Sequence, residues 1–325
     1  MKALVTGANG FIGSHLAAAL RGRGCDVRCL LRPTADRRWL DGLDYEEAIG
    51  ALDDRPALER AAAGVDVVYH CAGVTKARND AAYHYVNAAG TDNLARACAA
   101  QGTPPLLVYL SSQAAAGPSL KRDAKGEGAA CEPITGYGRS KLAGERALAA
   151  RAGDLPYVVL RPSAVYGPRD TEMLVYFKFI ARGVEPAIGW NDRVVSLCYV
   201  DDLVDAALLA AGTPAARGRT YFVAHDEVWD WRGLGRAAAA AFGVRARRVM
   251  VPKALLFGVA TLAELAATFA GRSATLNREK ARDLVQDGWV CDVTKAKTEI
   301  GFKPRVGFAE GARLTAAWYR EQGWL

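Results

Sequence analysis

The chain has 325 residues, 51% of them hydrophobic and 24% charged, which is enough for about two domains of ordinary globular composition. This composition excludes a disordered chain, a collagen-like repeat and a small disulfide-stapled domain. The net charge of +7 is spread among acidic residues rather than collected in basic runs, which argues against a nucleic-acid partner. The seven cysteines form no CxxC pair and no Cys/His cluster with metal-ligand spacing, which predicts reduced thiols, a cytoplasmic location and no metal site.

The first 165 residues alternate short β-branched runs with longer segments rich in Ala, Leu and Arg, a pattern typical of βα units in a parallel sheet. The opening MKALVTGANG has neither the apolar segment nor the cleavage site of a secretory signal. Strands are predicted at 2–5, 27–31, 45–49, 65–70, 106–110 and 157–160, and helices at 15–23, 56–63, 82–100 and 137–151.

The sequence after residue 165 is less regular, with turn signals at 167–168, 186, 189 and 214. Helices are predicted at 173–182, 202–211, 232–242, 253–270 and 307–321. The predicted fold class is therefore α/β, a doubly wound parallel sheet of Rossmann type at 1–165. A smaller substrate-binding region at 166–325 follows it, and about 199–212 is expected to return to the first domain.

The apolar stretch 254–270 carries Glu264 and falls short of the ~20 residues that a transmembrane helix needs. We predict no transmembrane segment and interpret this stretch as a packing helix. A surface that accepts a lipophilic substrate or makes a peripheral membrane contact is the alternative.

A glycine-rich segment follows the first predicted strand at once and leads into a predicted helix. Gly7 allows a tight turn, Gly10 lets the backbone approach a pyrophosphate, and Gly13 lets the helix pack closely on the sheet. Phosphates bound here would meet the positive end of a helix. The segment predicts a dinucleotide site that includes Gly7, Asn9, Gly10, Phe11, Ile12 and Gly13.

Seven motifs in order resemble the extended short-chain dehydrogenase/reductase family, which includes the NAD-dependent epimerases and dehydratases. They are TGANGFIG at 6–13, HCAG at 70–73, VNAAGTDNL at 86–94, YLSS at 109–112, YGRSK at 137–141, LRPSAVYGPR at 160–169 and YVDDLVDA at 199–206. The resemblance covers nearly the whole chain, and its pattern is closest to the 3β-hydroxysteroid dehydrogenase and dihydroflavonol reductase branch. It implies hydride transfer between NAD(P) and an alcohol or ketone, and a homodimer formed through helices 82–100 and 137–151.

The residues after the second predicted strand favour NADP over NAD. An acid about 20 residues past the glycines usually holds the 2′-hydroxyl of the adenine ribose. Arg32 stands there instead, followed by Arg37 and Arg38, and a guanidinium suits a 2′-phosphate. The alternative is that Arg32 only stacks on adenine and the cofactor is NAD. Further cofactor contacts are expected from Leu52, Ala72, Gly73, Pro162 and Ser163.

Tyr137 and Lys141 lie four residues apart, so on a helix their side chains share one face. A phenol is a poor base at neutral pH, and a neighbouring ammonium lowers its pKa. The resemblance implies that Tyr137 is the general acid/base, that Lys141 also binds the nicotinamide ribose, and that Ser112 polarises the substrate oxygen, with Ser111 as its rival. It also implies that Asn87 organises a water beside Lys141, and a helix-packing amide is the alternative.

Two polar positions of the nucleotide-sugar members of this family are apolar in this chain. Ala164 replaces their Asn after the sixth strand, and Val195 replaces an Arg that binds the substrate diphosphate. We therefore expect a hydrophobic small-molecule substrate of steroid, lipid or polyketide type. A nucleotide-sugar epimerase or dehydratase that holds NAD tightly is the second hypothesis, and a non-catalytic, cofactor-binding regulatory protein is the third.

Overall fold

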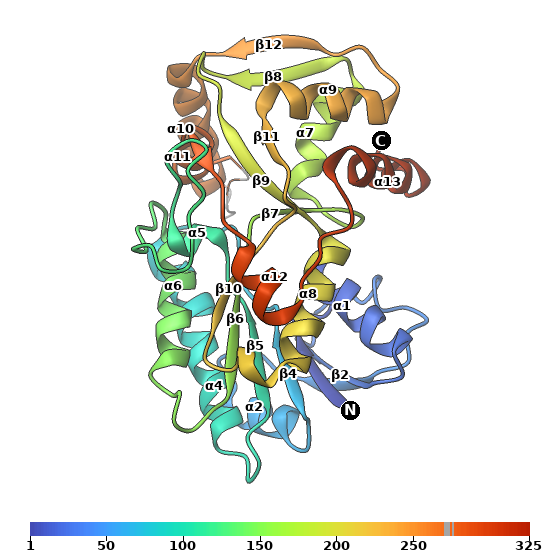
Figure 1. Cartoon of the computed structure of the whole chain (residues 1–325), viewed down its shortest axis with the longest axis vertical. Coiled ribbons are helices and arrows are strands. Elements are labelled where there is room, and N and C mark those ends of the chain that lie inside the picture. The colour runs from blue at the N-terminus through green and yellow to red at the C-terminus, as the bar shows by residue number, and fades with distance from the viewer. Residues whose placement is uncertain (270–273, 275) are drawn as a thin grey trace.

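A computed structural model of the chain describes residues 1–269, 274 and 276–325, and it has two parts stacked along the long axis (Figure 1). The lower part contains a seven-stranded sheet with the order β10-β6-β5-β4-β1-β2-β3, in which every pairing is parallel. The chain begins in the middle of this sheet and winds to both edges, which confirms the predicted doubly wound fold. The strands are β1 (Lys2–Thr6), β2 (Asp26–Leu31), β3 (Glu46–Ile49), β4 (Val67–His70), β5 (Leu106–Leu110), β6 (Tyr157–Pro162) and β10 (Thr220–Val223).

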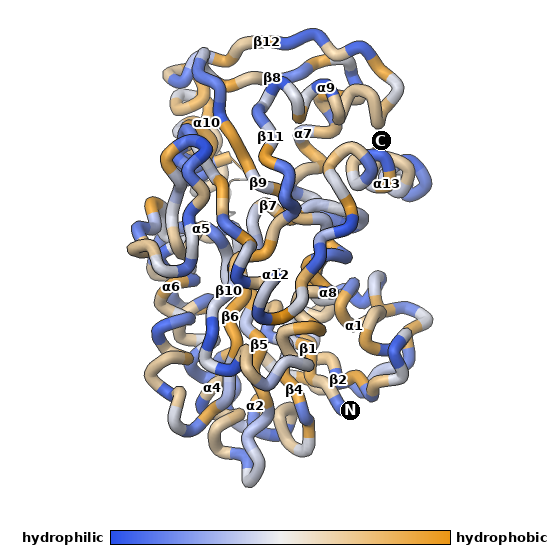
Figure 2. The backbone as a smooth tube through the Cα atoms, viewed as in Figure 1, coloured by the Kyte–Doolittle hydropathy of each residue, from blue (hydrophilic) through white to orange (hydrophobic). Residues whose placement is uncertain are grey.

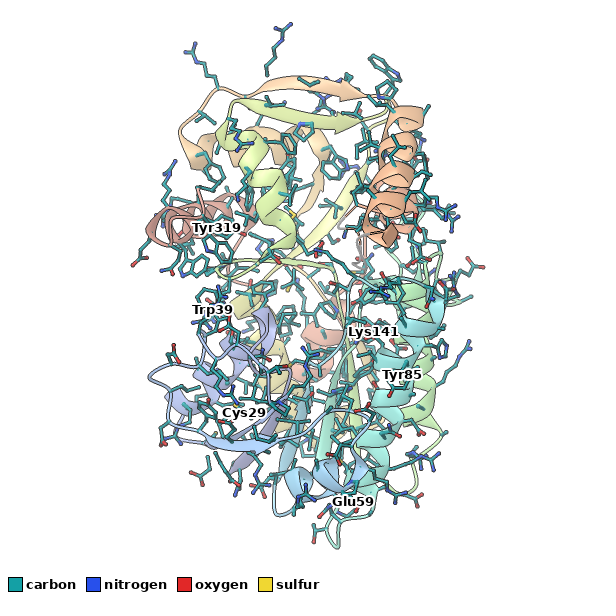
Figure 3. The ribbon with its side chains drawn as sticks, turned by 180° about the vertical axis from the view of Figure 1, so that it is seen from behind. Cys29, Trp39, Glu59, Tyr85, Lys141 and Tyr319 are labelled. Atoms are coloured by element: carbon teal, nitrogen blue, oxygen red, sulfur yellow. The ribbon has the colours of Figure 1, made fainter. Side chains whose placement is uncertain are left out.

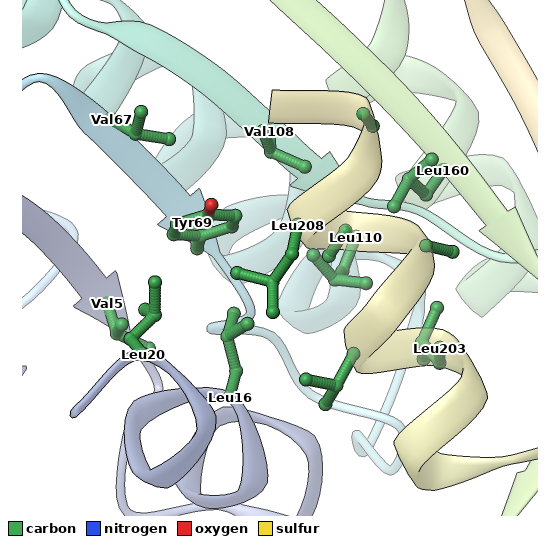
Figure 4. Close-up of a cluster of buried hydrophobic side chains, with 14 of the residues drawn as sticks. Val5, Leu16, Leu20, Val67, Tyr69, Val108, Leu110, Leu160, Leu203 and Leu208 are labelled. Carbon is green, nitrogen blue, oxygen red and sulfur yellow. The ribbon is translucent and has the colours of Figure 1, made fainter. Parts of the chain in front are cut away.

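Helices cover both faces of the parallel sheet. Val5 and Val108 point to one face, where they pack against Leu16 and Leu203 (Figure 4). Leu4 and its neighbours point to the opposite face, as the two-residue repeat of a strand requires. With both faces buried, hydrophobic residues follow the strands almost without interruption (Figure 2). The covering helices are α1 (Phe11–Gly22), α8 (Val200–Gly212) and α12 (Thr294–Ile300) on the first face, and α2 (Arg55–Ala62), α4 (Gly90–Ala99) and α6 (Gly136–Ala149) on the second.

Two predicted helices differ from the observed ones. α1 begins at Phe11 rather than at residue 15, because Gly10 already forms its N-cap. The predicted helix at 82–100 consists of α3 (Asp80–Tyr83), the π-helix η1 (His84–Ala89) and then α4. Widened π turns are frequent at functional sites, and this one contains Asn87.

The upper part is built on two small sheets. One has the order β11-β9-β13, with β7 also paired to β9, and the other pairs β12 with β8. Its core includes Phe177 and Phe242, whose ring centroids lie 5.4 Å apart. The elements are β7 (Ala164–Tyr166), α7 (Glu172–Ala181), β8 (Val184–Ile188), β9 (Val194–Tyr199), β11 (Val228–Asp230), α9 (Trp231–Phe242), β12 (Arg247–Val251), α10 (Lys253–Phe269), α11 (Arg278–Leu284), β13 (Gly288–Trp289) and α13 (Phe308–Glu321).

Several elements were not predicted from the sequence. They are the short helix α5 (Gln113–Ala116), the helices α11 and α12, the small-sheet strands, and β10, which joins the main sheet beside β6. The five helices predicted after residue 165 are present, with bounds shifted by at most two residues. The last residue of the predicted helix 253–270, Ala270, lies outside the described residues. The predicted division at residue 165 stays a prediction, although α8 packs on a face of the main sheet and β10 is one of its strands.

Within the described part of the chain, no helix is long and apolar enough to cross a membrane. The same residues contain no group of three or more His, Cys, Asp or Glu side chains placed to hold a metal ion. All seven cysteines are described and unpaired.

Candidate active site

The loop between β1 and α1 has the close packing that its glycines predict. Gly7 has a φ of +67°, and a Cβ atom on Gly7 would lie 2.8 Å from the backbone of Ala72. A Cβ atom on Gly13 would lie 2.2 Å from the Gly7 carbonyl oxygen, so only glycine lets the helix start this close to the strand. No side chain caps α1. The first N–H groups of the helix therefore remain available to an anion, and the loop fits the pyrophosphate of a dinucleotide.

Arg169 lies at the same end of α1, and sequence reasoning missed it. Its Nη1 donates a hydrogen bond to Ser14 Oγ at 3.0 Å, and its guanidinium lies 5.4 Å from the ring centroid of Trp39. Its φ of +72° is uncommon for a residue with a side chain and is often found at functional sites. Burial lowers the pKa of Arg169. A guanidinium held in this position suits a phosphate, and the turn Gly167-Pro168-Arg169 was the available signal.

The three arginines after β2 differ in their partners. Arg37 forms an ion pair with Glu47 and donates to the Ala35 carbonyl at 2.8 Å. Arg38 is paired with Asp36. The Arg32 side chain is exposed and has no hydrogen bond or ion pair with any described residue. Arg32 is therefore the arginine that is available to a ligand without breaking an existing pair.

His70 holds the end of β4 against β1. Its Nδ1 lies 2.7 Å from Thr6 Oγ1, and its Nε2 lies 2.9 Å from Thr91 Oγ1. Thr6 Oγ1 also accepts from the Ala72 N–H at 3.2 Å, and the Thr91 hydroxyl donates to the Asn87 carbonyl. The Thr91 hydroxyl uses its proton on Asn87, so it must accept from Nε2; burial lowers the pKa of His70 to about 3, so the ring is neutral and Nδ1 accepts from Thr6. This histidine therefore positions the loop at Ala72.

Asn87 connects that loop to the catalytic helix. Its Oδ1 accepts from the Val74 N–H at 2.8 Å, and its Nδ2 donates to the Val74 carbonyl at 3.0 Å and to Ser140 Oγ at 2.9 Å. Both amide hydrogens are thus in use. A Cβ atom on Gly73 would lie 3.0 Å from Asn87 Oδ1 and 3.8 Å from Lys141 Nζ. The side chain therefore holds the loop beside Lys141, and its predicted role in organising a water stays a prediction. The Leu52 side chain fills the space beside Gly90, the first residue of α4.

Ser112 and Tyr137 meet where β5 ends and α6 begins. Ser112 Oγ accepts from the Ala114 N–H at 3.1 Å and is also hydrogen-bonded to the Tyr137 phenol. Ser111, the rival serine, instead donates to the buried carboxylate of Glu145 at 2.5 Å. Ser112 is thus the serine of this pair that faces the phenol.

Lys141 lies between the two parts of the molecule (Figure 3). Its Nζ donates to the Leu110 carbonyl at 2.6 Å and lies 4.3 Å from the ring centroid of Tyr109. Burial lowers the pKa of Lys141 to about 8, and the Glu145 carboxylate opposes this shift.

Burial raises the pKa of Tyr137 to about 12, and the hydrogen bond with Ser112 opposes the increase. Tyr83, Asp283 and Glu172 add to the increase. Tyr137 is therefore protonated at neutral pH and able to donate a proton.

Among the buried polar atoms of the described structure, two that follow β6 and Ser112 in the sequence have no hydrogen-bond partner. They are Ser163 Oγ, directly after β6, and Gln113 Nε2, directly after Ser112. Burying a polar atom without a partner costs free energy, so such atoms mark places where a ligand can bind. Ser163 and its neighbour Pro162 were predicted to contact the cofactor. No sequence signal distinguishes Gln113.

The short helix α11 of the upper part lies over the start of α6. Glu279 Oε1 accepts from the Gly136 N–H at 2.6 Å, directly before Tyr137. The carboxylate of Glu172 on α7 forms ion pairs with Lys76 and Lys280, whose Nζ atoms lie 2.7 Å and 3.6 Å from its oxygens. Asp283 has a buried, unpartnered Oδ1, and burial raises the pKa of Asp283 to about 6. Residues of α7 and α11, which are far from the site's motifs in the sequence, thus border the site in the fold.

Comparison with known proteins agrees with this geometry. The model of the NAD dependent epimerase/dehydratase family matches residues 3–224. A ceramide reductase of Caulobacter vibrioides is 31% identical over 322 residues, which cover 99% of this chain and 95% of the relative. Sterol demethylase protein B of Methylococcus capsulatus is 30% identical over all of both chains. The UDP-glucose 4-epimerase of Thermus thermophilus in complex with NAD has a TM-score of 0.79 and 25% identity, covering 98% of this chain and 99% of that one.

The family match covers more than half of the chain, and it contains the glycine loop, Ser112, Tyr137 and Lys141. Relatives with names such as ceramide reductase match the chain over nearly its whole length. The chain therefore belongs to the NAD dependent epimerase/dehydratase family and is an NAD(P)-dependent oxidoreductase of the short-chain dehydrogenase/reductase type.

Proposed function

We propose that this protein interconverts a ketone and a secondary alcohol on a hydrophobic, lipid-like molecule. The observation that carries the proposal is the surroundings of Val195, at the position where nucleotide-sugar members place an arginine. Val195 is paired with Trp229 on one neighbouring strand and with Trp289 on the other. The Val195 side chain itself provides no cation for a diphosphate, and a tryptophan neighbours it on each adjacent strand. The name of the ceramide reductase relative points to the same class of substrate.

The chain's own residues have distinct roles in this reaction. When bound, the nicotinamide supplies or accepts the hydride. Ser112 donates a hydrogen bond to the substrate oxygen, and Tyr137 gives that oxygen a proton in reduction or removes one in oxidation. Lys141, held on the Leu110 carbonyl, presents its ammonium to the nicotinamide ribose. Asn87 and His70 hold the loops on which this arrangement depends.

The cofactor is held along the carboxyl ends of the strands. The N–H groups of Phe11, Ile12 and Gly13, together with Arg169, face the pyrophosphate. Arg32 receives the 2′-phosphate, so we assign a preference for NADP over NAD. The remaining contacts predicted from the sequence are Asn9, Arg37, Leu52, Ala72, Gly73, Pro162 and Ser163.

Three further assignments belong to this proposal. Residues 1–165 form the cofactor domain and 166–325 the substrate region. Two copies associate through the outer faces of η1, α4 and α6. The enzyme works in the cytoplasm, which its seven unpaired cysteines favour.

The test gives the purified protein a panel of candidate substrates and measures turnover from the absorbance of NADPH or NADH. We expect turnover of long-chain or sterol-like ketones and no turnover of UDP-sugars. Turnover of a UDP-sugar with copurified, non-exchanging NAD, and none of the ketones, would establish the epimerase hypothesis instead. Tyr137→Phe should reduce turnover by at least about a hundredfold while cofactor binding is retained, since general acid/base catalysis contributes roughly 10²–10⁴-fold.

A further inference from the structure

After Lys253, the outward face of α10 carries no polar side chain as far as residue 267. Its exposed side chains after Lys253 come from Ala254, Leu255, Val259, Leu262, Leu265 and Ala266. Leu255 is 57% exposed, Leu262 is 68% exposed and Leu265 is 53% exposed. At about 100° per residue these positions form one stripe along the helix. A helix that faces water normally carries charged or polar residues on that side, so this apolar face is expected to contact another molecule.

The opposite face of α10 is already packed. Leu256 and Ala260 are buried against Ala281 of α11. The one acidic residue of α10, Glu264, lies opposite the stripe and is paired with Arg278. The apolar stripe therefore lies outside the protein's own core.

We propose that this stripe, from Leu255 to Leu265, docks the enzyme on the surface of a lipid bilayer. The proposal rests on the proposed function, because a lipid-like substrate resides in such a bilayer. Four large side chains that are about half exposed form a patch of roughly 300–600 Å². A stable protein–protein interface buries roughly 800 Å² on each partner, so the stripe is small for a second copy of this chain. Insertion into a bilayer has no such minimum, because lipid chains surround each side chain individually.

The surroundings of the stripe fit the boundary between lipid and water. Trp190 is 79% exposed, and its neighbour Gly189 lies beside Lys253 at the first turn of α10. Tryptophan and lysine are the side chains that collect at this boundary. Lys253 and Arg282 are exposed and form no ion pair with a described carboxylate, which favours anionic headgroups.

The position of α10 also connects the bilayer to the reaction. α10 packs on α11, and Glu279 of α11 is hydrogen-bonded to Gly136, the residue before Tyr137. One helix, α11, thus separates the stripe from the start of α6, where the proposed acid/base residue lies.

The experiment compares wild type with Leu255→Ser/Leu262→Ser and with Leu120→Ser/Leu209→Ser, which removes two exposed leucines elsewhere. Each protein is sedimented with phosphatidylcholine vesicles, with and without phosphatidylglycerol, and Trp fluorescence is recorded. We expect wild type and the control to bind, more strongly to anionic vesicles, and the α10 variant to partition at least about tenfold more weakly. Wild type that stays in the supernatant, or an α10 variant that binds like wild type, overturns the proposal.

Two controls distinguish docking on a bilayer from self-association and from damage to the reaction site. Light scattering measures mass, and a change from dimer to monomer in the α10 variant would assign the stripe to a second copy and overturn the proposal. Activity on a short-chain ketone dissolved in water should be the same for all three proteins. If the α10 variant no longer binds vesicles but keeps this activity, the stripe acts in membrane binding and not in the reaction. If the proposed function is wrong, wild type itself does not turn over the ketone.

Discussion

The protonation of Tyr137 depends on the groups around it. Asp283 and Glu172 raise its pKa, but Glu172 is balanced by Lys76 and Lys280, whereas Asp283 Oδ1 has no described partner. Asp283→Asn removes a negative neighbour, so the phenolate is stabilised and the pKa of Tyr137 falls. Alcohol oxidation needs the phenolate and increases as pH rises through that pKa. We therefore expect the alkaline increase in oxidation rate to move to lower pH.

The measurement is the pH dependence of kcat/KM for alcohol oxidation. Asp287→Asn is the matched control, because Asp287 is exposed and is not among the main groups that raise the pKa of Tyr137. Identical profiles for the two variants would show that Asp283 does not influence the reacting phenol.

Arg32 and Arg169 should affect cofactor binding differently. Arg32→Ser removes the one available guanidinium after β2, so we expect kcat/KM for NADPH to fall at least about tenfold, with little change for NADH. Arg169→Gln should weaken both cofactors alike, because pyrophosphate is common to them. Arg38→Gln is the control, since Arg38 is already paired with Asp36. Equal losses of NADPH and NADH activity in the Arg32 variant would contradict the NADP assignment.

At the scale of elements, α6 is joined to the sheet by one buried ion pair. Arg161 of β6 binds Glu145 of α6 through two hydrogen bonds of 3.0 and 2.6 Å, and the two side chains are only 7% and 8% exposed. Glu145→Gln leaves the guanidinium buried without a counter-charge, which should cost about 3–5 kcal/mol of unfolding free energy. Urea unfolding measures the difference.

Glu59→Gln removes an exposed pair with Arg55 on α2 and should cost less than about 0.5 kcal/mol. If the two variants lost similar amounts of unfolding free energy, burial would not be what determines the contribution of the Glu145–Arg161 pair.

At the scale of the whole molecule, the outer faces of η1 and α6 are the expected dimer surface. Ala89 is exposed at the end of η1, next to α6. Wild type should have twice the 34.7 kDa chain mass by light scattering. Ala89→Arg should produce monomers, because two added charges face each other across a twofold axis. A wild-type monomer, or an unaltered dimer in the variant, would place the interface elsewhere.

The candidate site was predictable wherever adjacent residues carry the chemistry. Gly7 and Gly13 lie in one short segment at the start of α1, and Tyr137 and Lys141 are one turn apart on α6, so local spacing alone places each pair. The contacts of Asn87 and Arg169 were not predictable in the same way. Each depends on a partner in a distant segment, Val74 and Ser14 respectively.

By itself, the sequence determined the parallel sheet, the glycine loop and the position of Tyr137 and Lys141 one turn apart on a helix, because these follow from short-range periodicity and steric space. Only the tertiary structure decided that β10 completes the sheet and that α11 brings Asp283 over Tyr137. It also decided that Arg37 forms an ion pair with Glu47 while Arg32 stays available to a ligand, and that helix α10 exposes one apolar face. These features depend on contacts between segments that are far apart in the sequence. A local pattern of residues does not specify which distant segment it will contact in the fold.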